Sequence, residues 1–148
     1  MCGRRKKTEG EQALGRSRGG FSTKLHGLAD GLGNPLAFSL TAGQQGDAPQ
    51  ALPLLDRITA KAVIADKAYD TDAILQAVAA SRALAVIPPR ATRVQQRPTD
   101  WQLEPQRHKI EILFGFMQQY RRVFARFEKL ARRYLAFVHL VAACILLR

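Results

Sequence analysis

The sequence predicts an α/β fold, a mixed sheet with flanking helices, and three observations lead to this class. The chain has 148 residues, of which 47% are hydrophobic, so it is long enough to bury the core of one domain. Short strand-like segments are separated by segments whose apolar residues recur at helical spacing. Their order is strand, strand, helix, strand, helix, strand, helix, helix, and alternation of this kind is typical of α/β sheet domains.

The first two elements are predicted to form a β-hairpin. Residues 21–28 alternate between the two faces of a strand, and a second strand-like run covers 35–41. The turn residues Asp-Gly-Leu-Gly-Asn stand between them at 30–34. Residues 1–20 are polar, basic and glycine-rich, so we expect a flexible basic tail there, because such a segment buries too little apolar surface to become ordered. The domain itself is expected to span 21–148.

Helices and strands are predicted to alternate through the rest of the chain. N-cap residues, an early proline and β-branched runs mark their ends. The expected elements are a helix from Asp47 to Ile58, a strand over 61–65 that ends at Asp66, a helix from Asp70 or Thr71 to Ala80, a strand over 84–87, a polar loop over 90–103, and two helices over 104–127 and 128–147.

The charge of the chain favours a polyanionic partner. Lys and Arg number 23 against 12 Asp and Glu, which gives a formal net charge of +11. Each phosphate that a cation neutralises releases a counterion, so DNA or RNA binding is expected. The cations concentrate at the two ends of the chain, over 1–24 and 105–148. Phosphate contacts are expected from Arg16 and Arg18 in the first segment and from Arg107, Arg121 and Arg122 in the second.

The cysteines and the apolar segments of the sequence indicate where in the cell the protein is expected. Cys2 and Cys144 have neither metal-ligand spacing nor a disulfide framework, which fits a reducing cytoplasm. The N-terminus has no apolar segment of the kind found in signal peptides. The last apolar run, 134–147, is shorter than the ~20 residues that span a bilayer. We therefore expect a cytoplasmic, nucleoid-associated protein without a membrane partner.

Two carboxylates stand out, although spacing alone favours structural roles for both. Asp66 follows a buried strand, where α/β sheets often carry functional groups, yet aspartate at a strand end is more often a turn or cap residue. Glu111 shares a polar helical stripe with Arg107, Gln118 and Arg122. An ordinary ion pair between Arg107 and Glu111, four residues apart, explains that stripe equally well.

Several ordered blocks of the sequence resemble bacterial insertion-sequence transposases with an RNase-H-like DDE core. The resemblance covers about residues 12–148, and its several blocks make it more specific than any single motif. The blocks are GRSRGGFSTKLHGLADGLGNPLAFSLTAGQQGDAPQ at 15–50, VIADKAYD at 63–70, AVIPPR at 85–90, EPQRHKIEILFGFMQQYRRV at 104–123, and FEKLARRYLAFVHLVAACILL at 127–147.

The resemblance implies roles for individual residues. Asp66 matches the second metal-binding carboxylate of the family, and Glu111 matches the third, in a helical Y-x2-R-x3-E-x6-K signature in which Arg107 also matches. The tyrosine and lysine of that signature, which the family uses to handle transposon-end DNA, are Glu104 and Gln118 here. Gln118 is expected to contact DNA from the position of the lysine. The implied cofactor is Mg²⁺ or Mn²⁺, expected only in the complete site. The implied partners are the terminal inverted repeats of the transposon and target DNA.

The first catalytic Asp of the family lies on a strand upstream of the block that begins at Gly15. We therefore expect a domain truncated at its N-terminus, with the first catalytic strand missing. Such a chain resembles a downstream reading frame joined to its partner by frameshifting, or a truncated copy, and we expect no useful DNA cleavage by it alone. Its protein partners would be the upstream-frame product or further copies on DNA.

Two other functions remain open at this point. One is a non-catalytic DNA-binding remnant of a transposase, or an inhibitor that occupies transposon ends or pairs with the full-length enzyme. The other is a basic structural nucleic-acid protein, for which the blocks around Asp66 and Glu111 would be coincidence.

Overall fold

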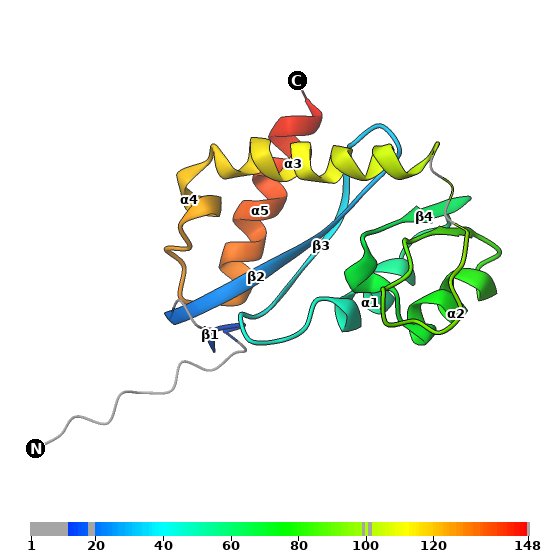
Figure 1. Ribbon diagram of the computed structural model, residues 1–148. Coiled ribbons are helices and arrows are strands. Elements are labelled where there is room, and N and C mark those ends of the chain that lie inside the picture. The colour runs from blue at the N-terminus through cyan, green and yellow to red at the C-terminus, as the bar shows by residue number, and fades with distance from the viewer. Residues whose placement is uncertain (1–11, 18–19, 99, 101, 148) are drawn as a thin grey trace, which may run out of the picture.

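The computed structural model describes residues 12–17, 20–98, 100 and 102–147, and it confirms the α/β class. Two small sheets take the place of the single mixed sheet that the sequence predicts (Figure 1). Within the described residues no strand joins β2 to β4, which is why the sheets are separate. One sheet is antiparallel in the order β1 (Gly15–Ser17), β2 (Gly20–Ala29), β3 (Pro35–Ala42), and the other is a parallel pair of β4 (Ala62–Ile64) and β5 (Leu84–Val86).

The predicted hairpin is confirmed as β2 and β3. Its turn is held by the carboxylate of Asp30, whose Oδ1 accepts hydrogen bonds from the amides of Leu32 and Asn34 at 2.8 and 2.9 Å. Gly33 has a φ of +92°, which a residue without a Cβ adopts at little cost. Strand β1 lies inside the range that the sequence predicts as a tail. Backbone pairing with residues 20–22 of β2 orders it, a source of order that composition does not reveal.

The helices of the middle segment are shorter than predicted. The segment after Asp47 forms a 3₁₀ turn, η1 (Ala48–Gln50), and a short helix, α1 (Ala51–Leu55). Asp47 does not cap this helix through its side chain, because its carboxylate accepts a hydrogen bond from Nζ of Lys24 at 2.9 Å. Thr71 is the residue that caps α2 (Asp72–Ala80), accepting from the amide of Ile74.

The single helix predicted over 104–127 is wrong. The chain forms a 3₁₀ turn, η3 (Glu104–Arg107), then α3 (His108–Gln118), and after a break at Tyr120 the short α4 (Arg121–Phe124). Tyr120 has extended backbone angles, φ −89° and ψ 107°. The break lets Val123 enter the core, where its carbonyl accepts a 2.7 Å hydrogen bond from the hydroxyl of Tyr134 on α5 (Ala131–Leu146).

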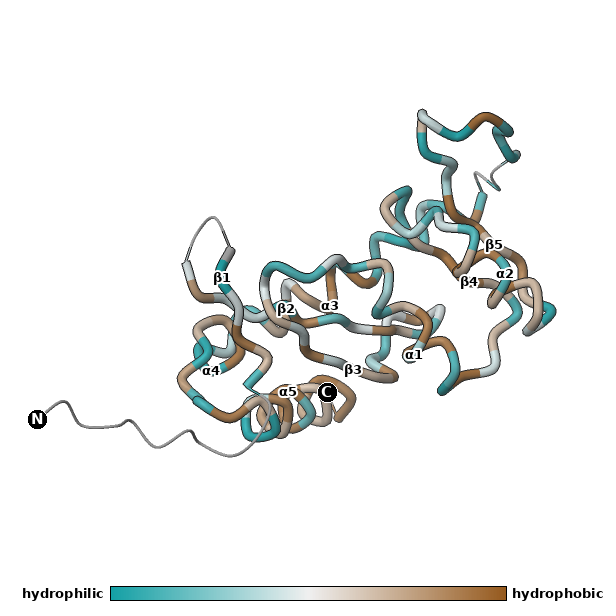
Figure 2. The backbone as a smooth tube through the Cα atoms, turned by 90° about the horizontal axis from the view of Figure 1, so that it is seen from below, coloured by the Kyte–Doolittle hydropathy of each residue, from teal (hydrophilic) through white to brown (hydrophobic). Residues whose placement is uncertain are grey.

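Among the described residues, the buried side chains of the hydrophobic core form two separate clusters. Figure 2 shows β4, β5 and α2 at one end of the chain's fold and α4 and α5 at the other. The first cluster joins the hairpin to α3 and α5 through Phe38, Leu113, Met117 and Val138. The second joins α2 to the end of β5 through Ile74, Val78 and Ile87. No helix among the described residues is long and apolar enough to cross a membrane.

Candidate functional site

Asp66 stands where the chain leaves β4. It is the N-cap of a 3₁₀ turn, η2 (Lys67–Tyr69), and its Oδ1 accepts a 2.7 Å hydrogen bond from the amide of Ala68. The side chain performs the capping role that spacing alone favours, but it uses a single oxygen for it and the residue is exposed. The carboxylate therefore remains accessible to solvent and to a cation.

Glu111 lies in the first turn of α3 and is held by two cationic or ionisable neighbours. Its Oε1 accepts a hydrogen bond from Nη1 of Arg107, and Nδ1 of His108 lies 2.7 Å from its Oε2. Arg107 also approaches Glu104 at 3.5 Å. The hydrogen bond with Glu111 raises the pKa of Arg107, against a smaller opposing effect of burial. The ion pair that the helical spacing predicts is thus present.

The structure brings Asp66 and Glu111 to the same cavity. This cavity has a volume of about 1240 Å³ and lies between β2, the segment from α1 to β4, and the start of α3. Asp66, Glu111 and Arg107 are all among its lining residues, and most of the others are apolar. The 3₁₀ turn η3, which leads into α3, also packs against β4. Two carboxylates far apart in sequence therefore line one open cavity.

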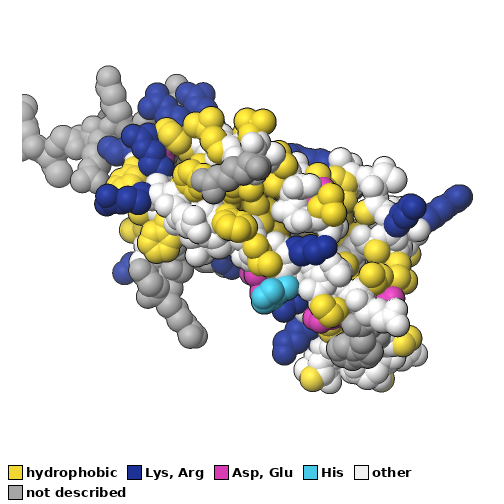
Figure 3. Space-filling view, turned by 90° about the horizontal axis from the view of Figure 1, so that it is seen from above, with side chains coloured by type: hydrophobic (Ala, Val, Ile, Leu, Met, Phe, Trp, Pro, Cys, Tyr) yellow, Lys and Arg dark blue, Asp and Glu magenta, His cyan; other side chains and the backbone are white. Residues whose placement is uncertain are grey.

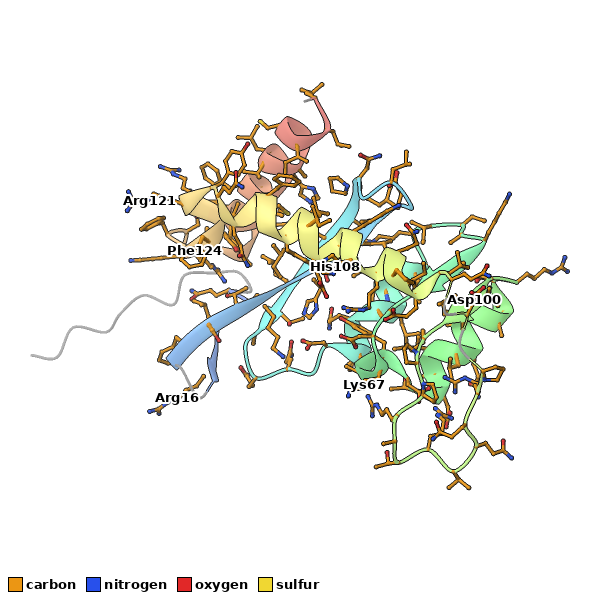
Figure 4. The ribbon with its side chains drawn as sticks, turned by 45° about the horizontal axis from the view of Figure 1, so that its top comes forward. Arg16, Lys67, Asp100, His108, Arg121 and Phe124 are labelled. Atoms are coloured by element: carbon orange, nitrogen blue, oxygen red, sulfur yellow. The ribbon has the colours of Figure 1, made fainter. Side chains whose placement is uncertain are left out.

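The remaining predicted DNA-binding residues lie elsewhere. Figure 4 shows Arg16 and Arg121 at one end of the molecule, away from His108 and from Lys67, the neighbour of Asp66, which both lie nearer its middle. The break at Tyr120 separates Arg122 from the polar stripe that the sequence predicts. Gln118 is exposed at the end of α3. The guanidinium of Arg122 lies 4.7 Å from the ring centroid of Phe137. Arg18 falls outside the described residues.

Cationic side chains occur along the whole face of the molecule that is seen from above. Figure 3 shows them clustered toward one end and scattered singly from the middle to the other end, with a histidine beside acidic and basic side chains near the middle. Cationic groups spread in this way suit phosphate contact, which positions a nucleic acid without reading its sequence.

A buried ion cluster beside the site was not predicted. The side chain of Asp70 is fully buried and accepts hydrogen bonds from the Arg90 amide at 2.8 Å, from Nε of Arg93 at 2.9 Å, and from Nη2 of Arg97 at 2.7 Å. Although burial opposes its ionisation, these donors lower the pKa of Asp70 to about 2. The cluster fixes the loop after β5 against the turn that begins at Asp66. The partners are 20 to 27 residues away in sequence, so no local pattern reveals them.

His26 is a second residue of the site that sequence reasoning leaves without a specific role. It is buried on β2, lines the same cavity, and its Nε2 lies 2.7 Å from Oγ1 of Thr41. Burial lowers the pKa of His26, although Asp47 acts in the opposite direction. The strand alternation places it on one face of β2, but only the tertiary fold shows that this face is covered.

The donor chemistry of the two carboxylates suits a hard divalent cation, which prefers oxygen ligands. The described residues contain no group of three His, Cys, Asp or Glu side chains that could hold a metal ion. The part of the chain that the structure describes thus supplies Asp66 and Glu111 as separate oxygen donors on one cavity.

Comparison with known proteins identifies the family. Residues 2–147 match the model of the transposase DDE domain. The chain is also 41% identical over 130 residues to a protein of Brucella ovis assigned as a transposase for insertion sequence element IS6501, covering 86% of this chain and 100% of that relative. No solved structure matches the chain. Transposases of this family act on DNA and generally use divalent metal ions. The chain therefore belongs to the DDE transposases of insertion sequences.

Proposed function

We propose that residues 21–148 are part of an RNase-H-like catalytic domain that cleaves and joins DNA strands during transposition of an insertion sequence. The observation that supports this most is the position of Asp66 and Glu111 on one cavity, from a strand end and a helix start that lie 45 residues apart in the sequence. Residues 1–20 would add basic groups for DNA contact, with β1 holding their C-terminal part at the sheet.

Asp66 and Glu111 are the residues that would hold Mg²⁺ or Mn²⁺. When bound, a pair of such ions stabilises both the attacking and the leaving oxygen of a phosphodiester. Asp66 contributes an exposed carboxylate held by one backbone hydrogen bond. Glu111 would give up its contact with His108 to hold the cation, and its ion pair with Arg107 would steady the carboxylate. The side chains thus orient the oxygen donors before metal and DNA arrive.

The DNA would be the terminal inverted repeats of the element and its target. Arg107 lies at the cavity, so it is suited to a phosphate near the reacting bond. Arg16, Arg121, Arg122 and Gln118 lie on the other half of the molecule and would hold more distant phosphates, as would Arg18. This arrangement gives a duplex contacts along the whole length of the fold rather than at the carboxylates alone.

A direct test of the site is cation binding by the purified chain. Paramagnetic Mn²⁺ broadens the NMR signals of nearby amides, so residues around Asp66 and Glu111 should broaden first. Asp66→Asn and Glu111→Gln should abolish that broadening. Equal broadening in both variants would exclude the site. Because two carboxylates are fewer than a complete three-acid site, nicking of inverted-repeat DNA by the chain alone is expected to be absent.

One observation favours a second function, a non-catalytic DNA-binding protein that inhibits transposition. Both oxygens of Glu111 are engaged by side chains of this chain, and the described residues hold no three-ligand group. Such a protein would bind inverted-repeat DNA and block a complete transposase. DNA binding that is unchanged in Asp66→Asn and Glu111→Gln, together with no Mn²⁺ broadening in the parent chain, would favour this function.

A further inference from the structure

Three phenylalanine side chains are exposed at the end of the molecule that carries α4. Phe21 on β2 is 79% exposed, Phe124 on α4 is 73% exposed, and Phe127 in the segment after α4 is 64% exposed. Arg126 donates a hydrogen bond to Oγ1 of Thr23, which lies on the same face of β2 as Phe21. Figure 1 also shows the segment after α4 running toward the start of β2. The three rings therefore project from neighbouring segments of the fold.

The segments that carry these rings are fixed to the rest of the molecule. Val123 is buried, and its carbonyl accepts a 2.7 Å hydrogen bond from the hydroxyl of Tyr134. Arg126 fastens the next segment, because its guanidinium donates to the backbone carbonyls of residues 12, 128 and 129. The rings are thus held at the surface by ordered backbone. Exposed apolar side chains that are grouped in this way often mark an interaction surface.

Cationic side chains stand beside the rings. Arg16 on β1 is the cross-strand partner of Phe21, so the two side chains lie on the same face of the sheet. Arg121 and Phe124 are one helical turn apart on α4 and are therefore also neighbours. Figure 4 shows Arg121 and Phe124 together, at the same end of the molecule as Arg16. Among the described residues neither arginine forms an ion pair, so both are available to an anion.

The charge around the rings favours one class of partner. Residues 121–133 contain six cationic residues and a single acidic one, Glu128. The side chain of Glu128 is only 11% exposed, and it lies 3.6 Å from Arg122. A second copy of this chain, with its net charge of +11, would be repelled by such a surface. A polyanion would be attracted to it.

We propose that this surface binds an unpaired, single strand of DNA. Its arginines would contact the phosphates, and its rings would stack on the bases. Proteins that bind single strands combine cations along the backbone with aromatic side chains on which successive bases stack. In a duplex the bases are stacked on one another, and cations alone reach the phosphates. The surface, which we call the aromatic–arginine surface, consists of Arg16, Phe21, Arg121, Phe124 and Phe127.

This inference deepens the proposed function and rests on DNA as the substrate. None of the five residues of the aromatic–arginine surface lines the cavity that holds Asp66 and Glu111. An unpaired strand bound there would be held apart from the candidate metal ligands. Its binding therefore requires neither carboxylate and no divalent cation.

An anionic membrane suits the surface less well than DNA. Helix α4 has four residues, whereas membrane-surface helices lay a long apolar face into the lipid. The rings come from a strand, a short helix and an irregular segment, so they do not form the continuous stripe of such a helix. The chain also belongs to a family that acts on DNA.

The test compares three oligonucleotides of about 12 nucleotides per strand, a length within the range that single-strand binding sites cover. One is single-stranded oligothymidine, one has the same phosphates with abasic residues in place of the thymidines, and one is a duplex. Each carries a fluorescent label and is titrated with the full chain in buffer that contains EDTA. Fluorescence anisotropy should show that oligothymidine binds about fivefold or more tightly than the abasic strand, because stacking on the rings adds affinity only where bases are present.

Variants of Phe124 provide a matched pair. Phe124→Leu keeps an apolar side chain but removes the ring, whereas Phe124→Tyr keeps the ring. The leucine variant should weaken oligothymidine binding about fivefold and leave abasic binding unchanged, and the tyrosine variant should bind like the parent chain. Phe127→Leu should repeat the effect. Since these side chains are exposed, the Tm should not change in any variant.

Val94→Ala is the control. Val94 lies in the loop after β5 and is 99% exposed, so its replacement removes an exposed apolar side chain outside the aromatic–arginine surface. Oligothymidine binding should be unchanged in this variant. A loss equal to that of Phe124→Leu would contradict a specific role of the rings.

Other results would overturn the proposal or assign the surface to a different partner. Equal affinities for oligothymidine and the abasic strand would exclude base stacking. A loss of duplex binding in Phe124→Leu as large as the loss of oligothymidine binding would assign the surface to paired DNA. Vesicles of phosphatidylserine and phosphatidylcholine that bind the parent chain but not Phe124→Leu, without base-dependent DNA binding, would assign it to a membrane. A dimer in sedimentation that Phe124→Leu disrupts would assign it to a second copy.

The outcomes separate this inference from the proposed metal site. All affinities are measured in EDTA, so absence of Mn²⁺ broadening would refute the metal site without affecting the aromatic–arginine surface. Base-independent binding would refute the surface and leave the test of Asp66 and Glu111 unchanged.

Discussion

Nδ1 of His108 lies 2.7 Å from Oε2 of Glu111, one helical turn away on α3. Arg107 binds the other oxygen of the same carboxylate. The candidate metal ligand is therefore held from both sides before any cation is present. Competition between these neighbours and a cation is a physical property of the site that can be measured.

Replacement of His108 should strengthen cation binding. His108→Ala removes a group that competes for Oε2 of Glu111, so the affinity for Mn²⁺ should rise by a few fold. Titration of amide broadening in NMR spectra measures this change. His139→Ala on α5 is the control and should leave the affinity unchanged. Equal affinities in the His108 variant and the parent chain would show that His108 does not compete.

Two substitutions of Asp66 separate its structural role from its proposed metal role. Asp66→Asn keeps an oxygen for the amide of Ala68, so the Tm should be nearly unchanged while Mn²⁺ broadening disappears. Asp66→Ala removes the cap as well and should cost about 1 kcal/mol of unfolding free energy. Chemical denaturation measures both. Equal stability losses in the two variants would contradict a capping role.

The Asp70 cluster should give the protein an acid-sensitive component of stability. The pKa of Asp70 is about 2 in the folded chain, below its usual value, so its ionised form stabilises the fold. That contribution is present above about pH 4 and is lost as the pH falls toward 2.

Asp70→Asn should therefore reduce the unfolding free energy by about 2 kcal/mol at neutral pH, since one pKa unit corresponds to about 1.4 kcal/mol. The difference from the parent chain should shrink in denaturation curves recorded from pH 5 to pH 2. The exposed neighbour Asp72, which pairs with Arg93, serves as the control, and Asp72→Asn should have a small effect. A constant difference across this range would argue against the cluster as its cause.

His26 should add a second pH-dependent contribution to the unfolding free energy, at a higher pH than the contribution of Asp70. Burial lowers its pKa in the folded chain, so the unfolded chain binds more protons. This contribution is complete above the unfolded pKa of about 6.5 and is lost as the pH falls below it. In His26→Gln the midpoint of chemical denaturation should change less between pH 7 and pH 5 than it does in the parent chain. An equal change in both proteins would point to another titrating group.

The arginines of the C-terminal half should fall into two classes. Arg121 is exposed on α4. Arg121→Ala should weaken DNA binding and should make the slope of log K against the logarithm of the salt concentration shallower, by the contribution of about one phosphate contact. Arg126 instead donates to backbone carbonyls of the N-terminal segment and to Oγ1 of Thr23, so Arg126→Ala should lower the Tm. Fluorescence anisotropy at several salt concentrations, paired with thermal denaturation, distinguishes them. A Tm loss in Arg121→Ala as large as in Arg126→Ala would contradict this division.

Local patterns predicted the elements that depend on neighbours in sequence. The hairpin turn at Asp30 and Gly33, the cap at Thr71 and the ion pair of Arg107 with Glu111 all arise from contacts within a few residues, which spacing reveals. The helix predicted through Tyr120 failed because the requirement to bury Val123 against α5 outweighs an uninterrupted apolar pattern.

The sequence by itself determined the α/β class and the transposase family, since both depend on ordered residue patterns along the chain. Only the tertiary structure decided that Asp66 and Glu111 line one cavity, that Asp70 gathers the arginines of a distant loop, and that β2 and β4 border the same cavity. These features bring together residues whose spacing in the sequence follows neither the helix repeat nor the strand repeat. They depend on packing of whole elements, which no local spacing encodes.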